Sequence, residues 1–194
     1  MKKVYIVLTH TGTILSRVIR KYTKNEFTHV SIALDQDLKR MYSFGRLNPY
    51  NPFWGGFVHE SIHYGTFKRF KNTKARIYSL EVTDEQYNNL KYVIEYIKIN
   101  KKSYNFNILG LFGVAFKIRR NKKFYFYCAE FVKYVLEQAK IEVDLPALIK
   151  PEDFKMLNHA EIRYQGKLKD YNKDVPCLFN NLILLQSSLS TKVS

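Results

Sequence analysis

Residues 124–132 read FYFYCAEFV, an apolar run that leads directly into a helical pattern. Apolar residues then recur every three or four positions, which predicts a helix over residues 129–139. Its inward face would hold Phe131, Val132, Val135, Leu136 and Ala139. Cys128 stands where the two patterns meet. At a helix N-terminus the unpaired N–H groups favour a thiolate and can hold a developing oxyanion, so Cys128 is a candidate nucleophile.

A second stretch, HVSIAL at residues 29–34, alternates as a strand does. Its apolar residues Val30, Ile32 and Leu34 would share one face, and His29 would lie on the other. An imidazole at hydrogen-bonding distance from a thiol can act as its base, which makes His29 the matching candidate. A lone Cys in a helix is also a common small core residue. The spacing of His29 and Cys128 therefore leaves a structural role open for both.

The remaining chain mixes strand and helix patterns. Short apolar or alternating runs between turn residues predict strands, and helical periodicity predicts helices. A capping-box sequence at residues 83–86 starts the clearest helix. We expect strands at 4–8, 29–34, 40–44, 57–62, 75–82 and 161–164, helices at 13–22, 83–97 and 129–139, a loop at 45–56, an apolar connector at 105–116 and a loose helix or tail at 178–189. This mixture predicts a single α+β domain.

Composition limits the protein class. With 194 residues and 46% hydrophobic content, the chain is long enough for one domain with its own core. Its formal net charge of +15 is spread along the sequence. Such a charge either attracts an anionic polymer or membrane surface or reflects a Lys-rich composition alone, since net charge governs steering and solubility more than fold. No specific nucleic-acid binding is expected.

The N-terminal residues resemble the charged end of a signal peptide. Their apolar stretch, residues 4–8, is shorter than the roughly 7–15 residues of a signal core, and no small-residue cleavage site follows. No run approaches the ~18 apolar residues of a membrane span. Two cysteines without a secretory signal favour free thiols in a reducing compartment. We therefore expect a cytoplasmic protein whose second cysteine, Cys177, is incidental.

Two motifs together resemble a known family. The stretch EFTHVSIAL (26–34), followed much later by YCAEFV (127–132), is similar to the permuted branch of the NlpC-type papain-like cysteine peptidases and amidases. That branch includes the YiiX-like proteins and, more distantly, the lecithin retinol acyltransferases, and in it the His precedes the Cys. The stretches at 12–19 and 164–166 also resemble YiiX-like sequences. The resemblance implies a permuted papain-like fold with a small antiparallel sheet packed against the helix of Cys128, forming one domain over 1–171 with a tail or loose helix at 172–194.

The resemblance also implies a polar residue that orients His29. The family usually places it on the strand after the His, where this chain offers Ser43. If the hairpin closes around residues 36–38, Ser43 lies diagonal to His29 on the same face. Glu60, on the following strand, is the other candidate, and a carboxylate stabilises an imidazolium better than a hydroxyl does. Both residues remain candidates for the third position.

The implied activity is that of a cysteine hydrolase without a cofactor or metal. Cys128 would attack a carbonyl, His29 would take and return the proton, and a thioester would then be hydrolysed. The implied substrate is an amide bond in a cell-wall stem peptide or a related small peptide or acyl amide. The alternatives are a non-catalytic binding module of the same fold and a lipid acyltransferase or thioesterase.

A rival motif is HESIH at residues 59–63, a literal H-E-x-x-H. In zinc peptidases this motif works because a helix places both His residues on one face, with Glu as the base. Glycines at positions 55, 56 and 65 flank the motif and leave little room for a stable helix. We therefore expect a strand in which His59 and Glu60 face opposite sides, and a zinc peptidase is the less favoured alternative.

Overall fold

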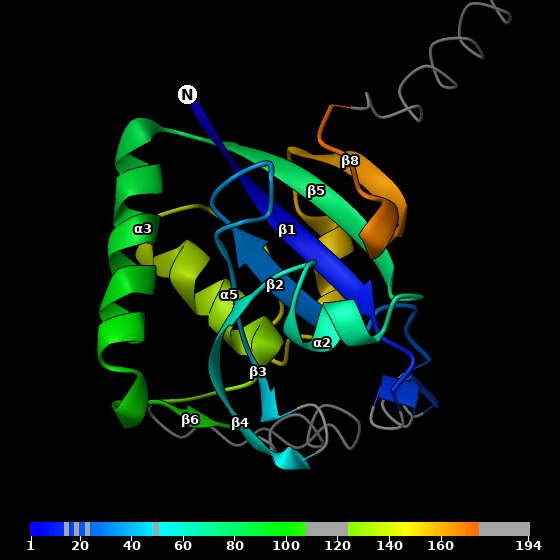
Figure 1. The fold of residues 1–194 in the computed structure, drawn as a ribbon. Coiled ribbons are helices and arrows are strands. Elements are labelled where there is room, and N and C mark those ends of the chain that lie inside the picture. Colours follow the sequence, from blue (N-terminus) through cyan, green and yellow to red (C-terminus); the bar gives the residue numbers. More distant parts are fainter. Residues whose placement is uncertain (14–15, 18–19, 22–23, 49–50, 108–123, 175–194) are drawn as a thin grey trace, which may run out of the picture.

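The computed structural model describes all residues except 14–15, 18–19, 22–23, 49–50, 108–123 and 175–194. It has a mixed α+β fold built on a six-stranded sheet in which every neighbouring pair is antiparallel. The strand order is β4-β3-β2-β1-β5-β8, so the N-terminal strand β1 lies in the interior of the sheet (Figure 1). The α+β class and the antiparallel sheet expected from the sequence are confirmed.

The sheet strands are β1 (Lys2–His10), β2 (His29–Ala33), β3 (Met41–Asn48), β4 (Asn51–Glu60), β5 (Lys74–Val82) and β8 (Ala160–Lys167). A separate short parallel pair is formed by β6 (Asn105–Phe106) and β7 (Tyr125–Phe126). The α-helices are α2 (Gly65–Arg69), α3 (Asp84–Ile99) and α5 (Cys128–Gln138). Short 3₁₀ turns are η1 (Lys101–Ser103), η2 (Pro151–Met156) and η3 (Leu168–Asp170).

The two long helices cover one face of the sheet. Helix α3 starts as expected, because the Thr83 hydroxyl accepts from the Gln86 N–H and the Gln86 side chain accepts from the Thr83 N–H. Helix α5 packs across β2 and β3 and against α3. Its predicted inward residues are all fully buried, in one core with Val30, Ile32 and Leu34. Burying these apolar side chains holds α5, and therefore Cys128 at its start, against the sheet.

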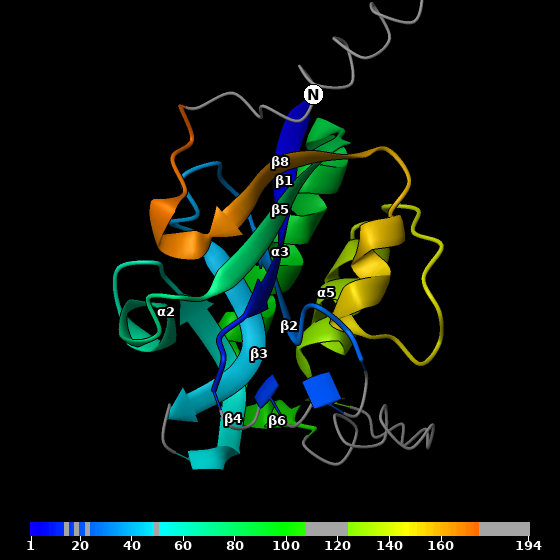
Figure 2. The ribbon, with the colours of Figure 1, turned by 90° about the vertical axis from the view of Figure 1, so that its right-hand side faces the viewer.

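The opposite face of the sheet carries a smaller core. It contains Tyr5, Val7 and Ala33, and Phe67 of α2 and Leu168 of η3 close over it. Figure 2 shows the sheet nearly edge-on, with α5 on one side and α2 and η3 on the other. Because successive side chains of a strand alternate between faces, each strand of the centre contributes to both cores.

The hairpin of β3 and β4 differs from the sequence prediction. Residues 45–56 were expected to form a loop because they are rich in Gly, Pro and Asn. Strand β3 instead extends to Asn48, and β4 begins at Asn51, with Gly45 opposite Gly56 in the ladder. Two strands paired along their length satisfy each other's backbone groups, which overrides the low strand propensity of glycine. The short helix α2 was not predicted.

Several predictions concern residues outside those described. Of the helix expected at 13–22, residues 16–17 and 20–21 are described as helical, and most of the others lie outside the described residues. Most of the apolar connector at 105–116, the expected loose helix at 178–189 and Cys177 lie outside the described part of the chain.

Candidate active site

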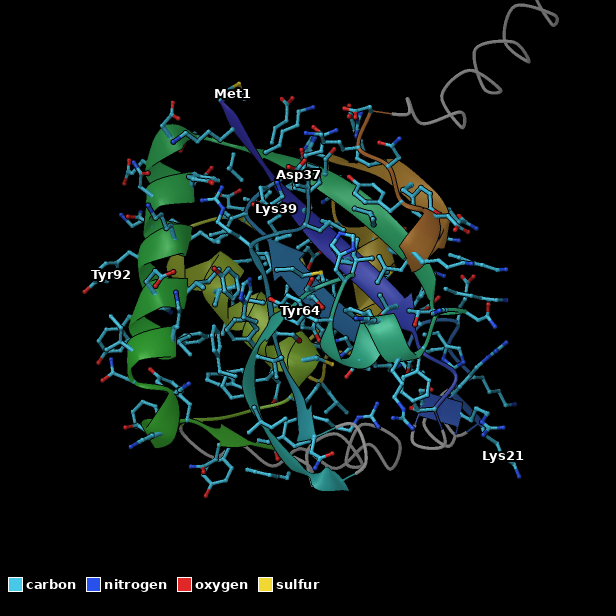
Figure 3. All side chains as sticks on the ribbon, in the orientation of Figure 1. Met1, Lys21, Asp37, Lys39, Tyr64 and Tyr92 are labelled. Carbon is cyan, nitrogen blue, oxygen red and sulfur yellow. The ribbon has the colours of Figure 1, made fainter. Side chains whose placement is uncertain are left out.

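A pocket lies where α5, β2 and the β3–β4 hairpin meet the segment around α2. Its cavity measures about 160 Å³, similar to the engineered cavities of about 150 Å³ that hold one benzene ring. Cys128, His29 and Glu60 all line it. Tyr64, which precedes α2 and is labelled in Figure 3, lines it as well. The pocket therefore brings together Cys128, His29 and Glu60, and His59 of the HESIH motif lines it too.

Cys128 is the first residue of α5, as the sequence predicted to within one position. Two hydrogen bonds fix Tyr127, the residue before it. The Tyr127 hydroxyl donates to the Ile149 carbonyl at 2.7 Å, and the Glu130 carboxylate accepts from the Tyr127 N–H at 3.2 Å. The Cys128 side chain is only 4% exposed, and it lines the pocket. This position belongs to the first turn of α5, whose N–H groups have no carbonyl partner within the helix.

His29 is the first residue of β2 and is held by Glu60 of β4. Its Nε2 lies 2.9 Å from Glu60 Oε1, and the two side chains are 20% and 11% exposed. The second oxygen of the same carboxylate accepts a hydrogen bond from the Ser31 hydroxyl, two residues along β2. Glu60 is therefore held at both oxygens, so it can fix the orientation of the imidazole ring.

The charge state of His29 follows from these neighbours. Burial disfavours the imidazolium, but the Glu60 carboxylate and the hydrogen bonds to Cys128 and Glu60 outweigh it and raise the pKa of His29 to about 10. At neutral pH the ring is therefore protonated. His29 is thus an imidazolium between the Cys128 sulfur and the Glu60 carboxylate.

Ser43 does not contact His29. Its hydroxyl is fully buried and donates to the Val30 carbonyl at 2.8 Å. Of the two candidates for the third position, the structure thus brings Glu60 to the imidazole and assigns Ser43 a hydrogen bond within the sheet. The Ser43 hydroxyl is bound to the backbone of the neighbouring strand β2, whereas the longer Glu60 side chain extends from β4 to the His29 ring.

Sequence reasoning missed two residues that shape the pocket. Gly45 of β3 lies between His29 and Glu60, and a Cβ placed there would be 3.4 Å from His29 Cε1. Arg46, the next residue, also lines the pocket. Both fall in the stretch expected to be a loop. The signal that identifies them is a strand pattern that continues past residue 44. The sequence prediction instead ended the strand at Gly45.

The HESIH motif is not helical. His59 and Glu60 end β4, and His63 lies in the turn before α2. His59 Nε2 lies 2.7 Å from the Lys39 carbonyl, whereas Glu60 contacts His29. Within the described residues, no group of three or more His, Cys, Asp or Glu side chains is arranged to hold a metal ion. The motif therefore contributes both His59 and Glu60 to the pocket lining, but only Glu60 contacts His29.

Comparison with models of known protein families and with curated proteins returns no match for this sequence. Within the described part of the chain, no helix combines the length and apolar character required to cross a bilayer.

Proposed function

We propose that this protein is a cysteine hydrolase that cleaves an amide bond, with Cys128 as nucleophile, His29 as general acid and base, and Glu60 as the residue that orients His29. The observation that carries the proposal is the position of His29 between the Cys128 thiol and the Glu60 carboxylate in one pocket. The chain order His before Cys, and a sheet packed on the helix of the Cys, support a permuted papain-like fold.

In the acylation step the Cys128 thiolate attacks the substrate carbonyl carbon. The oxygen takes up negative charge next to the N-terminus of α5, where free N–H groups can donate to it. As the C–N bond breaks, the His29 imidazolium donates its proton to the leaving amine. The acyl group is then held on the sulfur as a thioester, and the imidazole is neutral.

In the deacylation step the neutral imidazole takes a proton from water. The resulting hydroxide attacks the thioester carbonyl, the acid leaves, and the thiolate and imidazolium are restored. Glu60 supports both steps by holding the ring, since its other oxygen is fixed by Ser31. The cavity of about 160 Å³ suits a single side chain or short acyl group on the substrate. Small peptides and acyl amides, including cell-wall stem peptides, are therefore the proposed substrates.

The test is turnover of a panel of short γ-glutamyl and N-acyl amides, with mass spectrometry of the trapped acyl-enzyme. We expect a thioester adduct on Cys128 and release of the amine by the wild-type protein. Cys128→Ala should abolish both, and Cys177→Ala serves as the matched control that should retain both. Limited iodoacetamide should likewise modify Cys128 in preference to Cys177 near neutral pH.

Two outcomes would count against the proposal. Equal labelling of both cysteines, or labelling only above the ordinary thiol pKa of about 8.5, would show that the site does not activate Cys128. No turnover of any substrate despite a reactive Cys128 would favour a binding module of the same fold.

A further inference from the structure

We infer that Arg46 selects a carboxylate-bearing acyl group and holds it beside the carbonyl that Cys128 attacks. The inference rests on the proposed function and deepens it, because it names a specificity residue and a substrate class. Arg46 belongs to β3 and lines the same pocket as Cys128, His29 and Glu60.

The Arg46 guanidinium lies in a partly buried, hydrogen-bonded position on the pocket wall. Arg46 is half-buried, and burial lowers its pKa. Its Nη2 donates to the hydroxyl oxygen of the buried Thr13 at 3.4 Å, and the Ser16 N–H donates to the same oxygen. The Thr11 hydroxyl also donates to this oxygen, at 3.3 Å. The Thr13 hydroxyl therefore acts as an acceptor that holds the guanidinium of Arg46 on the pocket wall.

The second support is the charge of the pocket. Among the described residues that line it, Arg46 is the only Lys or Arg and Glu60 is the only Asp or Glu. The reactive state adds an imidazolium and a thiolate, which balance each other. Counted over the described lining residues alone, the reactive state without Arg46 has a net negative charge that disfavours an anion. With Arg46 the positive and negative charges of these residues are equal, so the guanidinium offsets the cost of bringing in one carboxylate.

The geometry also favours a carboxylate over a phosphate. A planar guanidinium matches the two oxygens of a carboxylate. A phosphate monoester carries a charge of about −1.5 to −2 near neutral pH, more than a single guanidinium balances in a cavity of about 160 Å³. A monoanionic acyl group is the class that fits both the charge and the volume.

The experiment compares two reagents of nearly equal size, iodoacetate and iodoacetamide, at Cys128 of the full chain. Both react with the same thiolate, so the ratio of their rate constants cancels any change in thiolate population. We expect the ratio for the wild-type protein to exceed that of N-acetylcysteine by about tenfold, the effect of one nearby charge in a partly solvated site. Arg46→Gln should remove that preference, and Arg46→Lys should keep part of it.

Arg163→Gln is the matched control, because Arg163 lies on β8 and does not line the pocket. It removes the same charge and should leave the ratio at the wild-type value. A wild-type ratio equal to that of the free thiol, or an Arg46→Gln ratio equal to that of Arg163→Gln, would overturn the inference. The wild-type comparison needs no variant and holds even if Arg46→Gln unfolds.

A substrate pair separates this inference from the proposed function. A succinyl monoamide carries a free carboxylate, and its terminal carboxamide analogue does not. Preferential cleavage of the first, lost in Arg46→Gln, supports both proposals. Equal cleavage of the two leaves the hydrolase proposal standing and overturns the role of Arg46. A Cys128 that reacts with neither alkylating reagent would overturn both.

Discussion

His29 and Glu60 are hydrogen-bonded at 2.9 Å although their strands are not neighbours. Strand β3 runs between β2 and β4, and the contact crosses it next to Gly45. A Cβ at Gly45 would lie 3.4 Å from His29 Cε1 and 3.9 Å from Glu60 Oε1. Gly45 therefore leaves open space beside the point where an acid on β4 meets an imidazole on β2.

Gly45→Val should separate His29 from Glu60. A Cβ at Gly45 would be at ordinary contact distance from His29 and Glu60, so Gly45→Ala should be tolerated. The two further methyl groups of Val are expected to press on the His29–Glu60 contact. We expect the valine variant to lose most amide turnover, measured as kcat/KM, while remaining folded. Gly56→Ala is the control, since its Cβ would meet only the flexible Leu47 side chain. Full activity in Gly45→Val would argue against a functional His29–Glu60 contact.

Glu60→Gln should move the alkaline limit of activity to lower pH. The imidazolium acts as the acid in acylation, so activity falls as pH rises through the pKa of His29, which is about 10 in the wild-type protein. Glu60 contributes to that raised pKa, and a neutral amide removes the contribution. The pH profile of kcat/KM for both proteins measures the shift. Superimposable alkaline limbs would show that Glu60 does not act on His29.

His29→Ala should abolish turnover, and Ser43→Ala should not. His29 is both general acid and general base, each worth about 10²–10⁴-fold, and the two losses do not simply add. It lies opposite the apolar face of β2, so its truncation leaves the main core filled. Ser43→Ala removes a buried hydrogen bond to Val30 and should lower the free energy of unfolding by about 1 kcal/mol. Melting temperature and turnover of each variant separate the two effects.

His29 should make the stability of the protein depend on pH in a defined direction. Its pKa is raised from 6.5 in the unfolded chain to about 10 in the native protein. Between these values the native state holds a proton that the unfolded state has released, so its stabilisation is complete below pH 6.5 and is lost as pH approaches 10. Wild-type protein should lose stability over this window relative to His29→Ala in denaturant titrations. Parallel curves for the two proteins would contradict the raised pKa.

The same comparison in a Cys128→Ala background removes the contribution of Cys128 to the raised pKa of His29. In this background, the protein that keeps His29 should still lose stability with rising pH relative to the protein that also carries His29→Ala. The pH range of that loss should be narrower than in the wild-type comparison. The reason is that Glu60 still raises the pKa of His29 when Cys128 no longer does.

Chelation should not affect the proposed activity. His59 and His63 are not aligned by a helix, and the Glu of the motif is engaged by His29. We expect turnover to be unchanged by a strong chelator and by His63→Ala, and elemental analysis to find no stoichiometric zinc. About one zinc per chain, lost in His63→Ala, would instead support a metal site.

Local sequence patterns were sufficient for much of the fold. Helix α3 has its own capping box, and α5 has an apolar face with helical spacing, so both were predicted to within about one residue at their starts. The alternation of β2 was predicted from its first residue, and the buried run expected at 4–8 lies inside β1, which extends two residues further at each end. The positions of Cys128 at a helix start and of His29 at a strand start follow from these patterns.

Only the tertiary structure decided the third residue and the wall of the pocket. Whether Ser43 or Glu60 meets His29 depends on the partner that each side chain finds in the folded sheet. Ser43 donates to the Val30 carbonyl and Glu60 extends past Gly45 to the imidazole, and neither contact is encoded in the spacing along the chain. Arg46 enters the pocket because pairing with β4 extends β3 through residues that favour a loop. Local propensity is a preference of short segments, whereas strand pairing over long separations is set by the burial and hydrogen bonds of the whole sheet.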